Sequence, residues 1–269
     1  MEKFLTSVLT SKQNPTVKQV RKLHRAKERR QQNLLLLEGN NTITAAINSN
    51  YPLLTVFCTP NWQENHQQLV RKIIEKGQNL QLVSQEVLVT MATTVNPDGV
   101  IAIAERQSAR TPVVSRTKLG LVVERLQDPG NLGTIVRTAV ATNVDGLWLS
   151  QDSVDFDHPK LLRASVGEWF RLPMIATADL TSVVRQHQQH QIQVVATVPN
   201  AQKTYWDLDL TRPSLLLLGN ESGGLSSQLQ TLADEKISIP LYNGVESLNV
   251  AIATALILYE AQRQNHSSS

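Results

Sequence analysis

Six short, almost continuous apolar runs constrain the fold more than any other feature of the sequence. From residue 119 onward these runs alternate with stretches of helical periodicity. A strand that is apolar along its whole length must be buried on both faces, as in a parallel sheet that helices cover on each side. The pattern therefore predicts a doubly wound α/β domain. The predicted strands are 119–123, 146–149, 172–176, 192–198, 214–218 and 237–241.

The residues up to 105 predict a second, smaller α/β domain. Apolar residues at helical spacing predict one helix over 14–32, and a buried strand follows at 34–37. Further expected helices are 42–47, 65–76 and 85–92, and further expected strands are 53–58, 80–83 and 100–104. Residues 106–118 are polar and partly basic, as is typical of a linker. We therefore divide the chain into domains at 1–105 and 119–269, joined by the linker 106–118.

Length and composition predict a soluble, cytoplasmic protein. The 269 residues are 41% hydrophobic, which is enough to build a sizeable core in one large or two ordinary domains. No window approaches the ~20 apolar residues of a membrane span, and the N-terminus shows no signal-peptide pattern, so no membrane partner is expected. The single Cys58 excludes an internal disulfide, and its apolar neighbours indicate a small buried residue.

Positive charge is concentrated near the N-terminus, although the net charge of the chain is only +3. Residues 1–33 contain nine Lys and Arg residues against two Glu. Such clustering is the electrostatic footprint of a nucleic-acid partner, but a solvated helix face explains a charge run equally well. The residues that we expect to contact RNA phosphates here are Arg21, Lys22, Arg25 and Arg29.

Two loops that follow predicted strands combine Gly, Ser and Asn with a carboxylate. One loop runs from Gly219 to Gly224, and the other includes Glu246, Ser247 and Asn249. Ligands of α/β proteins bind at the carboxyl ends of strands, where loop backbone groups are free. The first loop contains neither the Gly-Lys-Ser/Thr of a P-loop nor G-x-G-x-x-G. The two loops therefore predict a ligand site of another kind.

Four motifs in this region resemble those of the SpoU-type (TrmH-like) RNA ribose 2′-O-methyltransferases. The first is Asp128-Pro129-Gly130-Asn131-Leu132-Gly133-Thr134-Ile135-Val136-Arg137-Thr138-Ala139, and the connector is 163–173. The other two are Gly219-Asn220-Glu221 and Ile239-Pro240 with Glu246-Ser247-Leu248-Asn249-Val250. The resemblance spans roughly residues 119–262, with the motifs in the family's order. Ser222 and the stretch 251–255 depart from the family, which often has Gly there, but no polar group that the chemistry needs is lost.

The resemblance implies an architecture and an activity. The C-terminal domain would contain a deep trefoil knot, bind S-adenosylmethionine and form a homodimer, while residues 11–105 look similar to a ribosomal-protein-like RNA-binding fold. The reaction would be methylation of a ribose 2′-hydroxyl. The N-terminal extension favours ribosomal RNA, because shorter tRNA-specific members largely lack it. Methylation of tRNA remains one alternative, and a non-catalytic RNA-binding or ribosome-assembly protein is another, which the intact polar motif residues argue against.

The resemblance assigns catalysis to Asn131, Arg137, Glu221, Ser247 and Asn249. Arg137 corresponds to the family's catalytic arginine, although from the residues alone it could also be a surface arginine of an amphipathic helix. Arginine is too basic to act as a general base. We therefore expect Arg137 to hold the hydroxyl or a phosphate and to stabilise developing negative charge. Glu221 would orient Arg137 or Asn131, or cap its own loop.

Helix caps and the cofactor account for the other motif residues. We expect Asn131 to be the N-cap of its helix, and Ser247 and Asn249 are both good N-cap residues for the last helix. The resemblance implies that the loops after three strands hold the adenosine, mainly through backbone hydrogen bonds. The expected cofactor-binding residues are Thr197, Leu218, Gly219, Ile239, Leu241 and Leu248.

Three further features are interpreted from the residues themselves. Arg163 either contacts RNA phosphate or forms an internal ion pair. The stretch 186–191 contains two histidines without a nearby Cys or carboxylate, which predicts a solvated helix end and no metal. The last helix is apolar nearly all round at 250–258, so it must be buried, either in the core or across a dimer.

Overall fold

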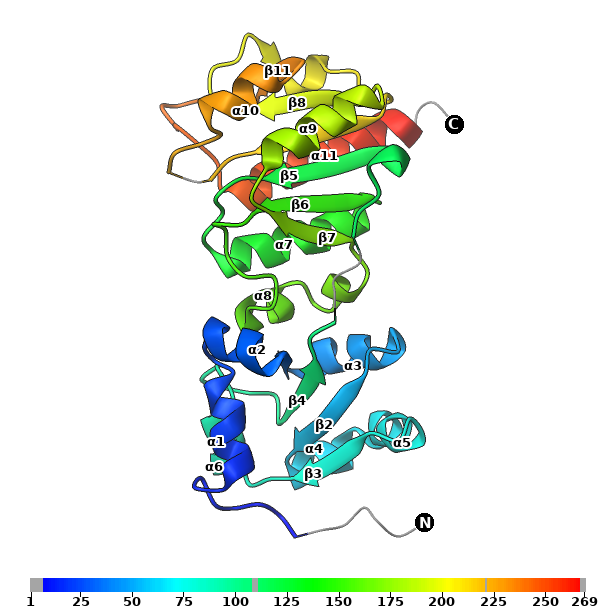
Figure 1. Cartoon of the computed structure of the whole chain (residues 1–269), viewed down its shortest axis with the longest axis vertical. Coiled ribbons are helices and arrows are strands. Elements are labelled where there is room, and N and C mark those ends of the chain that lie inside the picture. The colour runs from blue at the N-terminus through cyan, green and yellow to red at the C-terminus, as the bar shows by residue number, and fades with distance from the viewer. Residues whose placement is uncertain (1–6, 108–110, 221, 267–269) are drawn as a thin grey trace. The chain divides into compact units, whose positions relative to one another are not determined.

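The computed structural model describes residues 7–107, 111–220 and 222–266, and its contacts divide the chain into two compact units (Figure 1). Unit 1 comprises Met1–Gln107 and Asp155–Arg171, and unit 2 comprises Ser108–Val154 and Leu172–Ser269. The sequence-based division differs in two respects: residues 155–171 were expected in the C-terminal domain, and the expected linker 106–118 is divided between the two units after Gln107. Among the described residues no helix combines the length and apolar character needed to cross a membrane.

Unit 1 is built on a four-stranded mixed sheet with the order β1-β4-β2-β3. β1 (Leu34–Glu38) and β2 (Leu53–Cys58) pair antiparallel with β4 (Val100–Glu105), and β3 (Asn79–Leu82) pairs parallel with β2. Its core joins sheet residues such as Leu36, Phe57 and Ile101 to the helices α1 and α6. The helices are α1 (Pro15–Lys22), α2 (Ala26–Gln32), α3 (Asn40–Asn48), α4 (Pro60–Asn65), α5 (Gln67–Glu75) and α6 (Gln85–Met91).

One predicted helix of unit 1 is interrupted, and an additional helix precedes another. The helix expected over 14–32 consists of α1 and α2, which are separated at the buried Leu23. This break is stabilised by Arg29, whose Nη1 donates to the carbonyl oxygens of Leu23 at 3.0 Å and His24 at 3.2 Å. The helix expected over 65–76 is present as α5. A helix that was not predicted, α4, precedes it, and the chain turns at His66 between the two.

Residues 155–171 have their partners in unit 1, which explains why the sequence-based boundary missed them. The segment contains α8 (Pro159–Ala164) and the 3-10 helix η2 (Glu168–Phe170). The rings of Trp169 and Phe170 lie 6.0 and 5.1 Å from the ring of Tyr51. The buried Asp157 lies 2.8 Å from Nε of Arg106. These long-range contacts leave no periodic signal in the sequence.

Unit 2 contains a seven-stranded sheet with the order β7-β6-β5-β10-β8-β11-β9, and all of its strand pairs are parallel. β5, β6 and β10 are buried along their entire length, so both faces of the sheet are covered, as predicted for an α/β fold. The strands are β5 (Leu119–Val123), β6 (Gly146–Ser150), β7 (Met174–Thr177), β8 (Gln193–Thr197), β9 (Lys203–Thr204), β10 (Ser214–Leu218) and β11 (Glu235–Ser238).

Helices of unit 2 pack on this sheet (Figure 1). Residues of α9 and α10 pack on the face that carries Val122, Leu215 and Leu217, and α7 packs against α11. The α-helices are α7 (Pro129–Ala141), α9 (Leu180–Gln189), α10 (Ser227–Leu232) and α11 (Val250–His266), and the 3-10 helices are η1 (Val114–Arg116) and η3 (Tyr205–Asp207).

His187 at the end of α9 is buried, so the solvated helix end predicted there was wrong for this residue. Its Nδ1 lies 2.8 Å from the Val183 carbonyl oxygen, and its Nε2 lies 3.4 Å from the Thr117 hydroxyl. The ring also meets Trp148 edge-on, with 4.6 Å between ring centroids. Burial lowers the pKa of His187 below its usual 6.5. His190 is exposed, so the prediction holds only for that histidine.

Candidate active site

A pocket of about 460 Å³ lies in unit 2, where β8, β10 and β11 end. The carboxyl ends of parallel strands meet at one edge of a sheet, so the loops that follow these strands converge there. The lining includes all six residues predicted from the sequence to bind the cofactor: Thr197, Leu218, Gly219, Ile239, Leu241 and Leu248. Val250, Ala253 and Ile257 of α11 also line the pocket, and sequence reasoning missed them.

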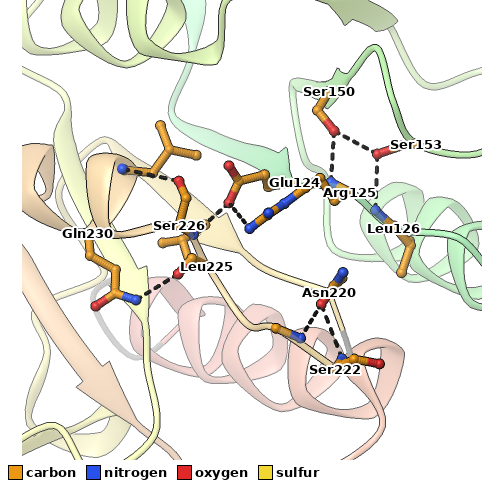
Figure 2. Close-up of polar contacts among 12 residues, drawn as sticks. Glu124, Arg125, Leu126, Ser150, Ser153, Asn220, Ser222, Leu225, Ser226 and Gln230 are labelled. Atoms are coloured by element: carbon orange, nitrogen blue, oxygen red, sulfur yellow. Dashed lines mark hydrogen bonds and ion pairs between the residues drawn. The ribbon is translucent and has the colours of Figure 1, made fainter.

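The loop from Gly219 to Gly224 folds back on itself. The Gly224 N–H donates to the Asn220 carbonyl oxygen at 3.1 Å, and these two residues form an isolated antiparallel bridge. The Asn220 side-chain oxygen accepts from the backbone N–H of Ser222 at 3.1 Å (Figure 2). It also accepts from the backbone N–H of Gly223. A Cβ at Gly219 would lie 2.0 Å from the Gly224 carbonyl carbon. Glycine is therefore required at 219 by the loop's own backbone.

Glu124, the first residue after β5, holds the far end of this loop. Its Oε2 accepts from the Ser226 N–H at 2.7 Å (Figure 2). The neighbouring Arg125 has a positive φ of 54°, and its N–H donates to the Ser150 hydroxyl at 2.7 Å. Glu124 was not among the predicted site residues, although a carboxylate directly after a fully apolar strand is a signal that could have found it. The contact of Glu124 with Ser226 connects the chain just before α7 to the end of the glycine-rich loop.

Asn131 and Asn249 come together although they are far apart in the sequence. Nδ2 of Asn249 donates to Oδ1 of Asn131 at 3.0 Å. Oδ1 of Asn249 accepts from the N–H of Ala251 at 3.0 Å, so Asn249 caps the start of α11 as predicted. The prediction that Asn131 is the N-cap of α7 was wrong. Asp128 has that role, with its Oδ1 accepting from the Asn131 N–H at 2.9 Å, so the Asn131 side chain is directed to Asn249 instead.

The other three predicted catalytic residues are Ser247, Arg137 and Glu221. Ser247 is exposed and lines the pocket. Arg137 lies on an exposed position of α7, and its guanidinium makes no hydrogen bond or ion pair with any residue that the structure describes. Glu221 lies outside the described residues.

The predicted RNA-binding residues of α1 and α2 divide by exposure. Arg21, Lys22 and Arg25 are exposed. Arg29 is only 1% exposed and lies 3.6 Å from both Asp155 and Asp157, so the prediction that it contacts RNA was wrong. A helix that packs against the protein cannot expose every residue of a basic run to solvent. Arg29 is the residue of this run that is buried, and a buried charge needs partners of opposite charge.

Arg163 forms the internal ion pair that was one of its two interpretations. Its Nη1 lies 2.7 Å from Oε2 of Glu38 and 2.7 Å from the hydroxyl of Thr93. The Glu38 side chain is almost completely buried, and a buried carboxylate is stable only when it is paired. The geometry therefore confirms the internal ion pair, whereas contact of the partly exposed Arg163 side chain with RNA stays a prediction.

The fold and the pocket define the class of this protein: an α/β unit with a pocket at the carboxyl edge of its parallel sheet, together with a separate mixed α/β unit. The family model of the SpoU rRNA Methylase family matches residues 118–259, and that of the MRM3-like substrate binding domain matches residues 14–102. The chain belongs to the SpoU rRNA methylase family.

Individual proteins are similar along nearly the whole chain. An uncharacterized tRNA/rRNA methyltransferase of Synechocystis is 45% identical, covering 97% of this chain and 95% of the relative. The Bacillus subtilis 23S rRNA (guanosine(2553)-2′-O)-methyltransferase RlmP is 28% identical, covering 93% and 97%. The crystal structure of an AdoMet-bound rRNA methyltransferase from Sinorhizobium meliloti has a TM-score of 0.83 at 30% identity, covering 96% and 97%.

Proposed function

We propose that this protein transfers the methyl group of S-adenosylmethionine to a ribose 2′-hydroxyl of ribosomal RNA. The observation that carries the proposal is that one pocket collects all six expected cofactor-binding residues. The same pocket is lined by Ser247, Leu248 and Val250, which flank Asn249 and its contact with Asn131. The cofactor pocket and the motif side chains therefore meet at the start of α11.

The pocket suits the chemistry of the proposed methyl donor. Leu218, Ile239 and Leu241 provide apolar walls for an adenine ring, and the loops provide backbone hydrogen-bonding groups. The Thr197 hydroxyl donates to the Leu217 carbonyl at 2.9 Å, so adenosine would be bound mainly by backbone groups there. Glu246 in the lining places negative charge near a cationic ligand. When bound, S-adenosylmethionine supplies a methyl group activated by its positively charged sulfur.

The chain's own residues would position and activate the hydroxyl. In-line attack requires an oriented 2′-hydroxyl that loses its proton as the new bond forms. Arg137 has no partner among the described residues, so its guanidinium is available to hold a phosphate or hydroxyl and to stabilise negative charge. The hydrogen bond between Asn131 and Asn249 joins the first turn of α7 to the start of α11. It thereby fixes the position of these two helix ends relative to each other.

The family relationship supports the proposed RNA substrate, and an exposed face of α11 supports a proposed homodimer. Ribosomal RNA is favoured over tRNA because RlmP, named for 23S rRNA, is similar along both units of the chain. One stripe of α11 is apolar and exposed: Ile252 at 55%, Leu256 at 38% and Tyr259 at 57%. We propose that this stripe is buried in a homodimer of the C-terminal domain. The trefoil knot is a proposal that rests on the family resemblance, and the cytoplasmic location is a proposal that rests on the length and composition of the chain.

Calorimetry with the full chain and S-adenosylmethionine tests the cofactor assignment. We expect wild-type protein to bind the cofactor, and Leu248→Arg to abolish binding because the longer charged side chain would fill the apolar pocket. Val95→Arg, an equivalent change at an exposed position of unit 1, is the control and should bind normally. Binding of NAD in place of S-adenosylmethionine would contradict the proposal.

A further inference from the structure

A second cleft lies in unit 1, between α3 and the corner where α4 meets α5, and none of the residues discussed so far as site residues lines it. Its volume is about 480 Å³. α3 and α5 are joined near their C-terminal ends, where Nζ of Lys76 donates to the Ile47 carbonyl oxygen at 2.6 Å. Toward their N-terminal ends the cleft opens, lined by Asn40 and Thr44 of α3 and by Gln68 and Lys72 of α5.

The lining of this cleft is rich in amides and close to neutral. Its side chains include four amides, with Asn65 and Gln67 beside Asn40 and Gln68, and the charges of Glu64 and Lys72 oppose each other. Amide side chains offer a donor and an acceptor together, which matches the edges of nucleobases. Phosphates are instead held mainly by cations. The chemistry of the cleft therefore suits a base.

Asn40 supplies an unsatisfied hydrogen-bond acceptor at this cleft. Its Oδ1 is buried and has no hydrogen-bond partner in the part of the chain that the structure describes. The backbone N–H of Asn40 is bonded separately to Oδ2 of Asp98 at 3.1 Å, so the side chain is not needed to begin α3. A buried acceptor without a donor destabilises a folded protein. Rotation of this side chain toward the cleft would bring the acceptor within reach of a ligand N–H group and remove that penalty.

His66 supplies a flat ring with a fixed proton position. Its ring stacks on that of Trp62, with centroids 4.6 Å apart and planes 12° apart. Nδ1 lies 2.9 Å from the Trp62 carbonyl oxygen, and because a carbonyl only accepts, Nδ1 carries the hydrogen. In the neutral ring Nε2 of His66 is then an acceptor. Trp62 is 2% exposed, so it holds the imidazole in place as a rigid surface on which a base can stack.

We propose that this cleft binds an unpaired nucleobase of the RNA substrate. Asn40 and Gln68 contact the base edge, His66 provides the stacking surface, and Lys72 contacts an adjacent phosphate. The inference rests on the proposed function, because it assumes an RNA substrate. It adds that unit 1 selects RNA by base identity, whereas the exposed cations of α1 and α2 would add affinity that does not depend on sequence.

The test measures the affinity of the full chain for single-stranded oligo(A), oligo(C), oligo(G) and oligo(U) of about ten nucleotides. We expect wild-type protein to bind its preferred oligomer about tenfold or more tightly than the weakest one. Asn40→Ala and Gln68→Ala should reduce this preference to within about twofold, because the base-edge contacts are lost. Gln31→Ala, an exposed amide of α2, should keep the full preference.

Asn40→Leu separates lost recognition from lost folding. Because Oδ1 of Asn40 is buried without a partner, an apolar side chain of similar size should leave the melting temperature unchanged or raised while the base preference disappears. A large fall in melting temperature together with retained preference would overturn the proposal.

The remaining outcomes separate this proposal from the proposed function. Equal binding of all four oligomers by wild-type protein, or an Asn40→Ala variant that keeps its preference, would overturn the proposed base site. Salt-dependent RNA binding in the same experiment would still support an RNA substrate. Preference for a free nucleoside monophosphate without preference among oligomers would also overturn it, because the cleft would then take a nucleotide and not RNA. No RNA binding at any salt concentration would overturn both.

Discussion

Arg137 is the side chain whose chemistry the proposed reaction needs most. Arg137→Ala should leave S-adenosylmethionine affinity within a few-fold, since Arg137 is absent from the pocket lining. Methyl transfer should fall about a hundredfold or more, as expected for loss of a donor that acts in the transition state. Arg137→Lys should restore little activity, because an ammonium group cannot form the paired hydrogen bonds of a guanidinium. Steady-state kinetics on rRNA measure this, and wild-type turnover in the alanine variant would refute the assignment.

His187 makes the stability of unit 2 depend on pH. Burial lowers its pKa below 6.5, so the unfolded chain takes up a proton at a higher pH than the folded one. The stability associated with neutral His187 is complete above about pH 6.5 and is lost progressively as the pH falls through that value. We expect the urea midpoint of the wild type to fall more between about pH 7 and about pH 5 than that of His187→Gln.

The exposed His190 gives the matched control for this experiment. His190→Gln should retain the pH dependence of the wild type, because that ring is solvated. Equal slopes in wild type and His187→Gln would show that His187 is not the group responsible.

The basic residues of the elements α1 and α2 have two different roles, since some are exposed to solvent and Arg29 is paired inside unit 1. Replacing Arg21, Lys22, Arg25 and Lys27 with Gln should weaken RNA binding and flatten its salt dependence, since these side chains are exposed. If all four contact phosphates, the logarithmic salt slope should fall by about three, measured from about 50 to 300 mM salt. An unchanged slope would mean that this surface is only solvated.

Arg29→Gln should behave differently, because its partners are internal. Removing one member of a buried charge pair typically costs about 3–5 kcal/mol, so we expect a large loss of stability. Thermal or urea unfolding measures it. A variant that loses RNA affinity but keeps wild-type stability would contradict the internal role of Arg29.

The elements also show what the sequence could and could not predict. Five of the six main strands of unit 2 were predicted from largely apolar runs, but the sixth was misplaced, because β11 (Glu235–Ser238) begins with two charged residues and overlaps the predicted run 237–241 only at its end. β9 (Lys203–Thr204) is too short to leave a pattern. A ligand site was predicted after β10 and β11 because Gly, Ser and Asn residues and a carboxylate follow the apolar runs there. The loop after β8 was included only through the family resemblance. The contribution of α11 was missed because an almost uniformly apolar helix does not reveal which face lines a pocket. The break between α1 and α2 depends on Arg29, a contact that periodicity cannot show.

The boundary of the units was the part of the fold least accessible to sequence. Residues 155–171 lie between β6 and β7 in the chain but pack with unit 1 through Trp169, Phe170 and Asp157. A fragment beginning near Lys118 would therefore carry this segment without its partners. The full chain is the appropriate material for every test of cofactor binding, RNA binding and methyl transfer.

The most direct test of the account follows a labelled methyl group from S-adenosylmethionine into ribosomal RNA that lacks this modification, using the full chain as catalyst. A 2′-O-methyl group blocks alkaline cleavage of the next phosphodiester bond, because the 2′-hydroxyl that would attack the phosphate is gone. We predict that the label is recovered in an alkali-resistant dinucleotide, and that Arg137→Ala yields almost none. Recovery of the label on a base, in alkali-sensitive mononucleotides, would contradict ribose methylation, and absence of any transfer would contradict the proposed activity itself.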